Sequence, residues 1–238
     1  MVLPRFFHAT YPFHVDSIIS LDQRETHHLK AVRRIGPGEQ VLLFNGCGEL
    51  AVAAVISPRE GSCRILSVEV HDRPAFCSFG LAFLQPHHLD IAIEKMTELG
   101  VGEIVLFPGD KSDRRTLSSS GKRRLHALMV AAMKQSSQLF YPKLNVVDSF
   151  EEAIAQLPSP YFWLDPDQSL PLFSRSLISL KKGVSLSVFV GPESGWSAQE
   201  KEMLSRKGEA VLLHPNVLRA ETAAMVAAYQ ASLWVQGW

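Results

Sequence analysis

The pattern of apolar and polar positions changes about a third of the way along the chain. Before that point the chain reads as short strands. Two apolar runs flank Asn45-Gly46 within residues 39–57, which predicts a β-hairpin closed by a type I′ turn. Residues 62–72 alternate like a further strand, and residues 26–39 are typical of one short helix. Residues 1–72 are therefore predicted to form a small β-barrel or sandwich.

After Arg73-Pro74, apolar runs of strand length alternate with amphipathic segments of helix length, a pattern that indicates parallel strands joined by helical crossovers. The predicted strands are 79–86, 103–109, 144–149, 161–166, 184–192 and 210–215, and the predicted helices are 88–100, 123–140, 149–157 and 218–235. The last helix is apolar on nearly every face, so it is predicted to be buried, either centrally or against a second subunit. The second part of the chain is thus predicted to be an α/β domain.

Three loops, at residues 162–168, 191–196 and 212–222, are expected at the carboxyl ends of strands, where open α/β sheets bind ligands. The second of them, GPESGW, is followed by Ser197-x-x-Glu200, a capping box that predicts the start of a helix. Its glycines allow a backbone to approach a ligand closely. A tight, well-capped turn without a ligand is the alternative interpretation, and the pattern alone does not choose between the two.

Composition narrows the class of protein. The formal net charge of zero argues against a protein that coats nucleic acid by bulk electrostatics. The three cysteines fit neither a disulfide framework nor a C-x-x-C metal site, so reduced thiols are expected. No secretory signal is visible at the start, and the longest apolar stretch, 220–235, is too short and too polar to span a membrane. A cytoplasmic protein without a membrane partner is predicted.

Several common catalytic motifs are excluded. The serine of GPESGW lies one position too late for the G-x-S-x-G elbow of serine hydrolases. Neither a dinucleotide-binding G-x-G-x-x-G after a strand nor a phosphate-binding P-loop is present. His27-His28 has no cysteine or glutamate partner at the spacing of a helical metal site, so no metal is predicted.

One segment is strongly basic. Residues 111–124 contain six basic side chains and a single acidic one, Asp113. The basic residues are Lys111, Arg114, Arg115, Lys122, Arg123 and Arg124. Such a run is either a solvated helix entry or a patch that follows the phosphates of a nucleic acid. On a chain of zero net charge, this concentration favours an RNA partner.

Three segments together resemble one known family. EKMTELGV (94–101), GPESGW (191–196) and HPNVLRAETAA (214–224) are similar, in order and spacing, to the bacterial 16S ribosomal RNA uridine-N3 methyltransferases. These enzymes are a branch of the SPOUT superfamily of knotted methyltransferases. PRFF (4–7), together with HHLKAVRRIGPGE, resembles the family's small RNA-binding barrel of the PUA type. The resemblance spans nearly the whole chain.

The resemblance implies two domains: a PUA-like β-barrel that binds RNA over residues 1–72, and an α/β SPOUT domain with a parallel sheet and a trefoil knot over residues 73–238. It implies S-adenosylmethionine as cofactor, and N3 of a specific uridine in 16S rRNA of the small ribosomal subunit as the methylated atom. It also implies a homodimer formed through the C-terminal domain, with the helix from Arg219 onward packed across the interface.

The same resemblance assigns the binding residues. The cofactor-binding residues would be Gly191, Pro192, Gly195, Leu213, His214, Asn216, Leu218 and Thr222. The RNA-binding residues would be Arg5, Arg33, Arg34, Arg114, Arg115, Arg123 and Arg124.

The catalytic candidates implied are Arg219, Glu221 and Glu193. Arg219 would stabilise the charge that develops on the uracil oxygens. Glu221 or Glu193 would accept the N3 proton if its surroundings raise its pKa. The structural alternative is that Arg219 pairs with one of the two glutamates at the start of a helix.

The chain also departs from the family. Ser194 and His214 stand where the family usually has glycine, and Gln138 stands where it usually has arginine. His87-His88 replaces a basic pattern before EKMTELGV. Because of these differences, a dimeric RNA-binding or ribosome-assembly protein without catalysis is kept as a second hypothesis. Methylation of another RNA by the same fold is a third hypothesis.

Overall fold

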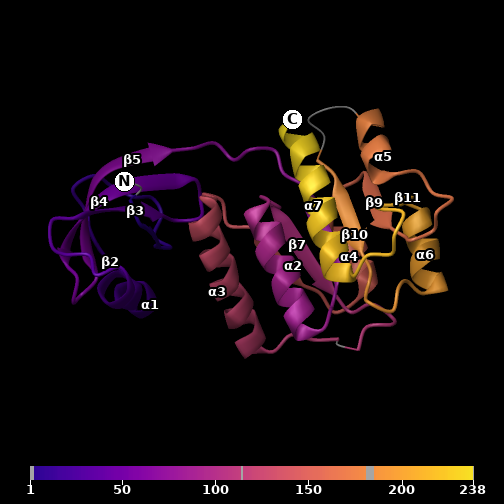
Figure 1. Cartoon of the computed structure of the whole chain (residues 1–238), viewed down its shortest axis with the longest axis horizontal. Coiled ribbons are helices and arrows are strands. Elements are labelled where there is room, and N and C mark those ends of the chain that lie inside the picture. Colours follow the sequence, from indigo (N-terminus) through magenta and orange to yellow (C-terminus); the bar gives the residue numbers. More distant parts are fainter. Residues whose placement is uncertain (1–2, 114, 181–184, 238) are drawn as a thin grey trace. The chain divides into compact units, whose positions relative to one another are not determined.

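The computed structural model describes residues 3–113, 115–180 and 185–237, and its chain forms two compact units (Figure 1). The first unit is Met1–Arg73 with Met133–Tyr141, and the second is Pro74–Ala132 with Pro142–Trp238. The sequence did not indicate that residues 133–141 pack with the first unit. The division into an RNA-binding domain and a catalytic domain at residues 72 and 73 stays a prediction.

The first unit is built on a five-stranded sheet of mixed direction. Its strand order is β1-β3-β4-β5-β2, with β1 parallel to β3 and the other pairs antiparallel. The elements are β1 (Arg5–Phe7), β2 (Ile18–Ser20), α1 (Gln23–His27), the π-helical turn η1 (His28–Val32), β3 (Gln40–Phe44), β4 (Glu49–Ser57) and β5 (Ser62–Val70). The predicted short helix is therefore two helical segments that begin earlier and end earlier than expected. One face of the sheet is dry because Phe6, Leu29, Val41, Leu43 and Ile65 are completely buried there.

The predicted hairpin is confirmed, but its predicted two-residue turn is wrong. Four residues separate β3 from β4, and the positive φ angles are those of Gly46 (77°) and Gly48 (97°). The Asn45 side chain instead caps the loop, since its Oδ1 accepts hydrogen bonds from the N–H groups of Cys47 (2.9 Å) and Glu49 (3.3 Å). An asparagine used in this way favours a longer loop than a type I′ turn.

A buried ion pair links α1 to the segment 133–141 within the first unit. The Lys134 ammonium lies 2.7 Å from Glu25 Oε2 and 5.2 Å from the centre of the Phe6 ring. The Glu25 side chain is 6% exposed and that of Lys134 is 16% exposed, so water screens the pair poorly.

We expect Lys134→Met to lower the free energy of unfolding by about 3 kcal/mol, because it leaves the Glu25 carboxylate buried without its cation. Denaturant unfolding of the full chain measures the loss. The control is Lys143→Met, which breaks a pair with Glu103 in which the lysine is 65% exposed, and should cost less than about 1 kcal/mol. Equal costs for the two variants would contradict the role of burial.

The second unit confirms the predicted parallel α/β arrangement. Its six strands are all parallel, in the order β11-β9-β10-β6-β7-β8. The strands are β6 (Ser78–Ala82), β7 (Glu103–Phe107), β8 (Lys143–Val146), β9 (Tyr161–Leu164), β10 (Ser187–Val190) and β11 (Gly208–Val211). The helices are α2 (Pro86–Glu98), α3 (Ser119–Ser136), α4 (Phe150–Gln156), α5 (Phe173–Ser179), α6 (Ala198–Ser205) and α7 (Ala220–Gln236). Only α5 was not predicted, and α3 begins and ends four residues before the predicted limits.

Both faces of this sheet are covered. Phe189 of β10 points into an aromatic cluster with Phe107, Phe150 and Trp196, on the face where α4 and α6 pack. Side chains of the opposite parity face α5 and α7; Phe162, for example, packs edge-on against Phe173. Figure 1 shows α7 lying beside α2, which it contacts, over the centre of the sheet. The buried positions of α7 explain its nearly continuous apolar sequence.

The three cysteines are free, as expected: Cys63 and Cys77 are buried and Cys47 is exposed. Burial raises the pKa of the Cys63 thiol to about 11 and that of Cys77 to about 12, so both stay protonated at neutral pH. Within the described ranges, no helix has both the length and the apolar character needed to cross a bilayer.

Candidate functional site

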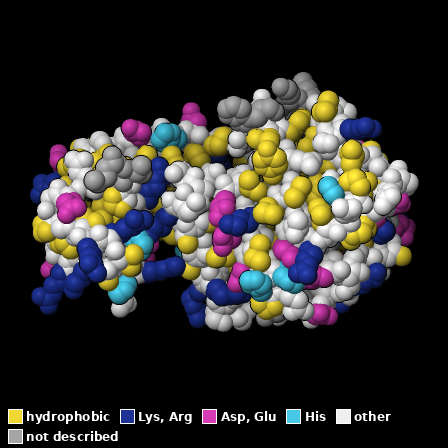
Figure 2. Space-filling model, in the orientation of Figure 1, with side chains coloured by type: hydrophobic (Ala, Val, Ile, Leu, Met, Phe, Trp, Pro, Cys, Tyr) yellow, Lys and Arg dark blue, Asp and Glu magenta, His cyan; other side chains and the backbone are white. Residues whose placement is uncertain are grey.

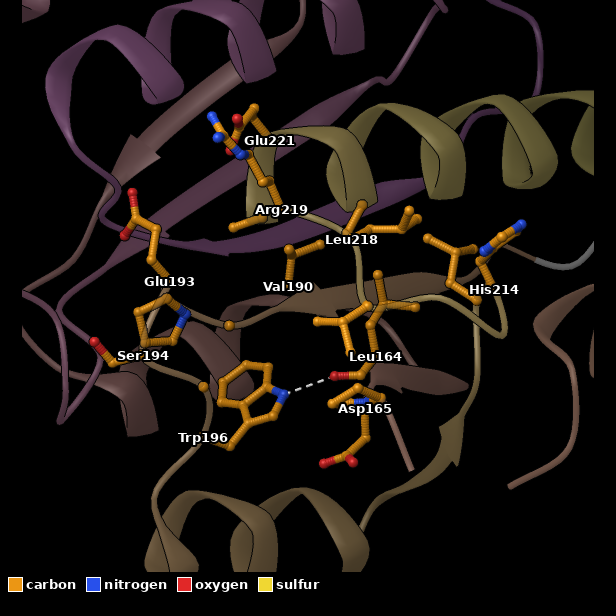
Figure 3. Close-up of a pocket in the computed structure, with 18 of the residues that line it drawn as sticks. Leu164, Asp165, Val190, Glu193, Ser194, Trp196, His214, Leu218, Arg219 and Glu221 are labelled. Carbon is orange, nitrogen blue, oxygen red and sulfur yellow. Dashed lines mark hydrogen bonds between the residues drawn. The ribbon is translucent and has the colours of Figure 1, made fainter. Parts of the chain in front are cut away.

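The loops after β9, β10 and β11 meet at the carboxyl edge of the parallel sheet and enclose a pocket of about 650 Å³ (Figure 3). This volume is typical of small-molecule sites, which span roughly 300–1,000 Å³. Leu164, Val190 and Leu218 form apolar walls between Trp196 and the first turn of α7. The three loops that the sequence placed at strand ends are therefore brought together around one cavity.

Most of the candidate residues of the second half line this pocket. All three catalytic candidates, Glu193, Arg219 and Glu221, do so. Of the cofactor candidates, seven line it: Gly191, Pro192, Gly195, Leu213, His214, Asn216 and Leu218. Thr222 is half-buried on α7 and does not line the pocket.

The two glycines of GPESGW have different structural roles. A Cβ atom on Gly191 would lie 2.9 Å from the Trp196 ring, so the missing side chain of this glycine makes room for the indole. Gly195 has a φ of 72° and its N–H donates to the Pro192 carbonyl at 2.8 Å. A Cβ on Gly195 would meet nothing within 4 Å. The assignment of both glycines to the cofactor site stays a prediction.

Trp196 fixes the loop after β10. Its indole N–H donates to the Leu164 carbonyl at 2.8 Å, which ties this loop to the end of β9. The ring stacks on Phe107 at an interplanar angle of 9° and is 5% exposed. Sequence reasoning did not single out Trp196, although a large aromatic residue directly after a turn glycine was a usable signal.

The predicted capping box at the start of α6 is confirmed. The Ser197 hydroxyl accepts from the Glu200 N–H, and the Glu200 carboxylate accepts from the Ser197 N–H at 2.7 Å. Glu200 is fully buried and also accepts from the Asp110 N–H at 3.0 Å. These bonds hold the exit of the GPESGW loop against the loop after β7.

A histidine joins two carboxylates at the mouth of the pocket. His88 Nδ1 lies 3.2 Å from Glu193 Oε1 and 4.0 Å from Glu221 Oε2. Glu193 Oε1 also accepts from the backbone N–H of Gln85 at 2.9 Å. Desolvation raises the pKa of Glu193, but the hydrogen bonds from Gln85 and His88 outweigh it, so the net pKa lies below its ordinary value. The raised pKa expected of a proton acceptor is therefore not found at Glu193.

Glu221 has a different environment. It belongs to the first turn of α7 and is 7% exposed. Among the described residues, its Oε2 atom has no hydrogen-bond partner. Arg219 caps the same helix and is exposed, and no ion pair joins it to Glu193 or Glu221 in the described part of the chain. The structural alternative, a salt bridge that occupies Arg219, is not observed.

The opposite end of the pocket carries other polar groups. His214 lies there, away from Glu193 and Glu221 (Figure 3), and its Nδ1 accepts from the Asn216 N–H at 3.0 Å. Asp165 pairs with Lys201 at 2.6 Å between Oδ2 and Nζ. Asp165 and Lys201 line the pocket, as do His88 and Lys111, and neither Asp165 nor Lys201 was proposed as a site residue from the sequence. Asp165 directly follows a buried strand, which was the available signal.

The basic segment 111–124 is only partly free to bind a polyanion. Lys111 donates to the Trp196 carbonyl at 2.9 Å, and Arg115 donates to the Asp110 carbonyl at 3.3 Å. Arg124 pairs with Asp90 of α2. Arg123 and Lys122 are exposed at the start of α3, whereas Arg114 lies outside the described residues. Three of the five described basic residues therefore contact protein groups.

The remaining RNA candidates belong to the first unit. Arg5 is on β1, and Arg33 and Arg34 are exposed after η1. His28, which the sequence analysis considered as a metal ligand, packs edge-on against Phe6, with ring centres 5.7 Å apart. Over the described ranges, no group of three or more histidine, cysteine or acidic side chains is suited to a metal ion.

Comparisons with known proteins give the chain its family. The RNA methyltransferase domain family matches residues 72–232, and the RNA methyltransferase PUA domain family matches residues 21–66. Ribosomal RNA small subunit methyltransferase E of Bacillus subtilis is 26% identical, over 90% of this chain and 91% of its own length. The protein of that name from Mycobacterium tuberculosis is 27% identical, over 100% of this chain and 94% of its own length.

Solved structures share the fold. The Neisseria gonorrhoeae ribosomal RNA small subunit methyltransferase E, bound to S-adenosylmethionine, has a TM-score of 0.81 at 24% identity and covers 95% of both chains. A probable rRNA methyltransferase from Porphyromonas gingivalis has a TM-score of 0.78 at 25% identity, again over 95% of both chains. The methyltransferase domain match alone covers more than half of the sequence and includes every residue that lines the pocket. The chain therefore belongs to the RNA methyltransferase family.

Proposed function

We propose that the protein methylates N3 of a specific uridine in 16S rRNA of the small ribosomal subunit, with S-adenosylmethionine as the methyl donor. The curated relatives, which match this chain over nearly their full length, are named as small-subunit ribosomal RNA methyltransferases. A structural relative carries S-adenosylmethionine. The observation that carries the proposal is the buried Glu221 oxygen, which has no hydrogen-bond partner among the described residues, near Arg219 at the mouth of a pocket of cofactor size.

The pocket suits the proposed cofactor. Its apolar walls are bordered by residues of the loops after β10 and β11 and by charged side chains at the mouth, which suits a ligand with an aromatic base and a polar tail. Gly195 and Leu218 would border the ligand, with Leu213, which precedes His214, and Asn216, whose N–H donates to His214, lining the same pocket. Ser194 and His214 are both exposed, and the volume of about 650 Å³ remains with their side chains in place. These two departures from the family do not fill the site.

S-adenosylmethionine would supply an electrophilic methyl group. The protein's own residues would then supply proton transfer and charge stabilisation. Uridine N3 carries a proton that must leave, and Glu221 is the proposed acceptor because its Oε2 is buried and accepts no hydrogen bond from the described residues. Arg219 is the proposed stabiliser of charge on the uracil oxygens, since the described residues leave its guanidinium unpaired and exposed at the pocket. N3 would have to be freed from any base pair before it could enter.

The finer architecture belongs to the same proposal. We propose that the first unit closes into a PUA-type barrel that binds RNA through Arg5, Arg33 and Arg34, and that the second contains a trefoil knot. Arg115, Arg123 and Arg124, with Arg114, are proposed to add RNA contacts near α3. The division between the domains is placed after residue 72.

We further propose a homodimer formed through α7. Met225, Val226, Tyr229 and Leu233 remain partly or fully exposed on this helix at spacings of three to four residues. Figure 2 shows hydrophobic side chains gathered over α7 and α5, and Ile178 of α5 is 79% exposed. A stripe of this kind favours burial against a second copy.

The first test is calorimetric titration of the protein with S-adenosylmethionine, followed by methyl transfer to 16S rRNA and to assembled small subunits. Saturable binding and a methylated uridine at N3 are expected. If no ligand binds at millimolar concentration, with or without RNA in the cell, the cofactor assignment is overturned. Binding of RNA alone would then support the non-catalytic RNA-binding hypothesis.

A further inference from the structure

His88 occupies a position that neither the proposed cofactor site nor the proposed proton acceptor explains. It lies in the first turn of α2, and its side chain is 28% exposed. Its Nδ1 atom is 3.2 Å from Glu193 in the loop after β10 and 4.0 Å from Glu221 at the start of α7. One imidazole therefore contacts or approaches carboxylates from two other elements, and all three elements border the pocket.

The Glu193 carboxylate is also bound to the backbone of α2. The Gln85 N–H donates to the same oxygen that faces His88, at 2.9 Å, and Gln85 is the N-cap residue of the 13-residue helix α2. A carboxylate is stabilised at this end of a helix because unpaired N–H groups point toward it. Glu193 is thus held at α2 by two donors, and the loop it belongs to is fixed by the same contacts.

No other cationic side chain that lines the pocket pairs with Glu193 or Glu221 among the described residues. The other charged groups that line the pocket are Lys111, Asp165, Lys201 and Arg219. Lys111 donates to the Trp196 carbonyl, and Lys201 pairs with Asp165. His87, the neighbour of His88 on α2, is exposed, with its ring centre 6.2 Å away. In the described part of the chain, His88 is the titratable cationic side chain in contact with Glu193 and nearest to Glu221.

We propose that His88 is a positioning residue whose imidazolium holds the Glu193 loop beside the first turn of α7 and neutralises one of the two carboxylates at the pocket mouth. The inference rests on the proposed function. With a neutral imidazole, both carboxylates remain as uncompensated negative charge where the phosphates of RNA must approach. Figure 2 shows histidine, acidic and basic side chains side by side over the ends of α2 and α7. RNA is therefore bound more weakly as His88 loses its proton.

Histidine changes charge between about pH 5 and pH 8. The effect of this charge on RNA binding is therefore measured by replacing His88 with side chains whose charge does not change over that range. His88→Arg keeps a cation at every pH, and His88→Gln is neutral at every pH. His87→Gln removes the adjacent histidine, which has no contact with either carboxylate in the described residues, and serves as the matched control. Steady-state kcat and KM for RNA are measured for each variant from pH 5.5 to 8.5, at saturating S-adenosylmethionine.

We expect the substitutions at His88 to change KM for RNA while kcat stays nearly constant. At each pH, KM for RNA should be about 5- to 10-fold higher for His88→Gln than for His88→Arg, with kcat within about 2-fold. As the pH rises from 5.5 to 8.5, the KM of the wild type should move from that of the arginine variant toward that of the glutamine variant. Because each comparison is made at one pH, the pH dependence of uridine ionisation cancels.

The outcomes separate this inference from the proposed function. An active wild type whose KM ratio to His88→Arg stays constant with pH overturns the role of His88 alone. His87→Gln matching His88→Gln overturns it as well. If His88→Gln does not fold, the comparison of wild type with His88→Arg still decides. A wild type that methylates neither 16S rRNA nor small subunits at any pH overturns the proposed function and this inference together.

Discussion

Glu221→Gln should reduce the kcat of methyl transfer by about 10²- to 10⁴-fold, the range associated with loss of a general base. The amide keeps the shape of the carboxylate but cannot accept the uridine N3 proton. The Oε2 atom of Glu221 has no hydrogen-bond partner among the described residues, so the exchange breaks no observed bond at that atom. Initial rates with isotopically labelled S-adenosylmethionine, at saturating RNA, measure the effect.

Glu193→Gln is the matched comparison. Glu193 is the other carboxylate at the pocket mouth, but its oxygen already accepts from Gln85 and His88, and its pKa lies below the ordinary value. A weaker base contributes less to proton abstraction, so kcat should fall by less than about 10-fold. A larger loss for Glu193→Gln than for Glu221→Gln would move the proton acceptor to Glu193. Unchanged rates for both variants would remove carboxylate catalysis from the mechanism.

Gly191→Val should reduce both stability and cofactor affinity. The new Cβ would lie 2.9 Å from the Trp196 ring, which is fixed by stacking on Phe107 and by its bond to the Leu164 carbonyl. The ring must move, and overpacking of this kind costs about 1–3 kcal/mol of unfolding free energy. Because Trp196 and Leu164 both line the pocket, affinity for S-adenosylmethionine should fall at least about 10-fold. Thermal unfolding and calorimetry measure the two losses.

Gly195→Asn provides the control for this pair of effects. Gly195 has a φ of 72°, and its Cβ position is open, so asparagine, which tolerates left-handed backbone, introduces a side chain without a clash. Affinity should fall while the unfolding temperature changes little. Valine would not serve here, because a branched side chain is strained at positive φ. Unaltered affinity in Gly195→Asn would indicate that the ligand does not border this loop.

The periodicity of the sequence was sufficient to predict the layout of the second unit. Apolar runs alternate with amphipathic helices such as 88–100, and this repeat appears as the parallel sheet with α2, α3, α4, α6 and α7. Local capping was also predictable, because Ser197 and Glu200 interact only with their near neighbours in the box itself. The helix α5 was missed, since its seven residues are too few for a clear period.

The sequence was sufficient to predict candidate residues in loops that directly follow predicted strands. The three loops lie at strand ends in the sequence, and parallel strands bring their carboxyl ends to one edge, so a shared site followed. The assignment of individual glycines did not follow, because the partner of Gly191 is an indole five residues later whose direction depends on Phe107 and Leu164. Thr222 does not line the pocket, although its neighbour Glu221 does, because one step along a helix turns a side chain by about 100°.

By itself, the sequence determined the α/β class of the second half, the strand-end loops and the helix caps, because each depends on residues close together along the chain. Only the tertiary structure decided which groups meet across long separations. His88 and Glu221 are 4.0 Å apart, and Glu25 is paired with Lys134, although each pair lies more than a hundred residues apart in sequence. Such contacts depend on how the elements pack, and local hydrophobic patterns carry no information about which polar side chains that packing brings together.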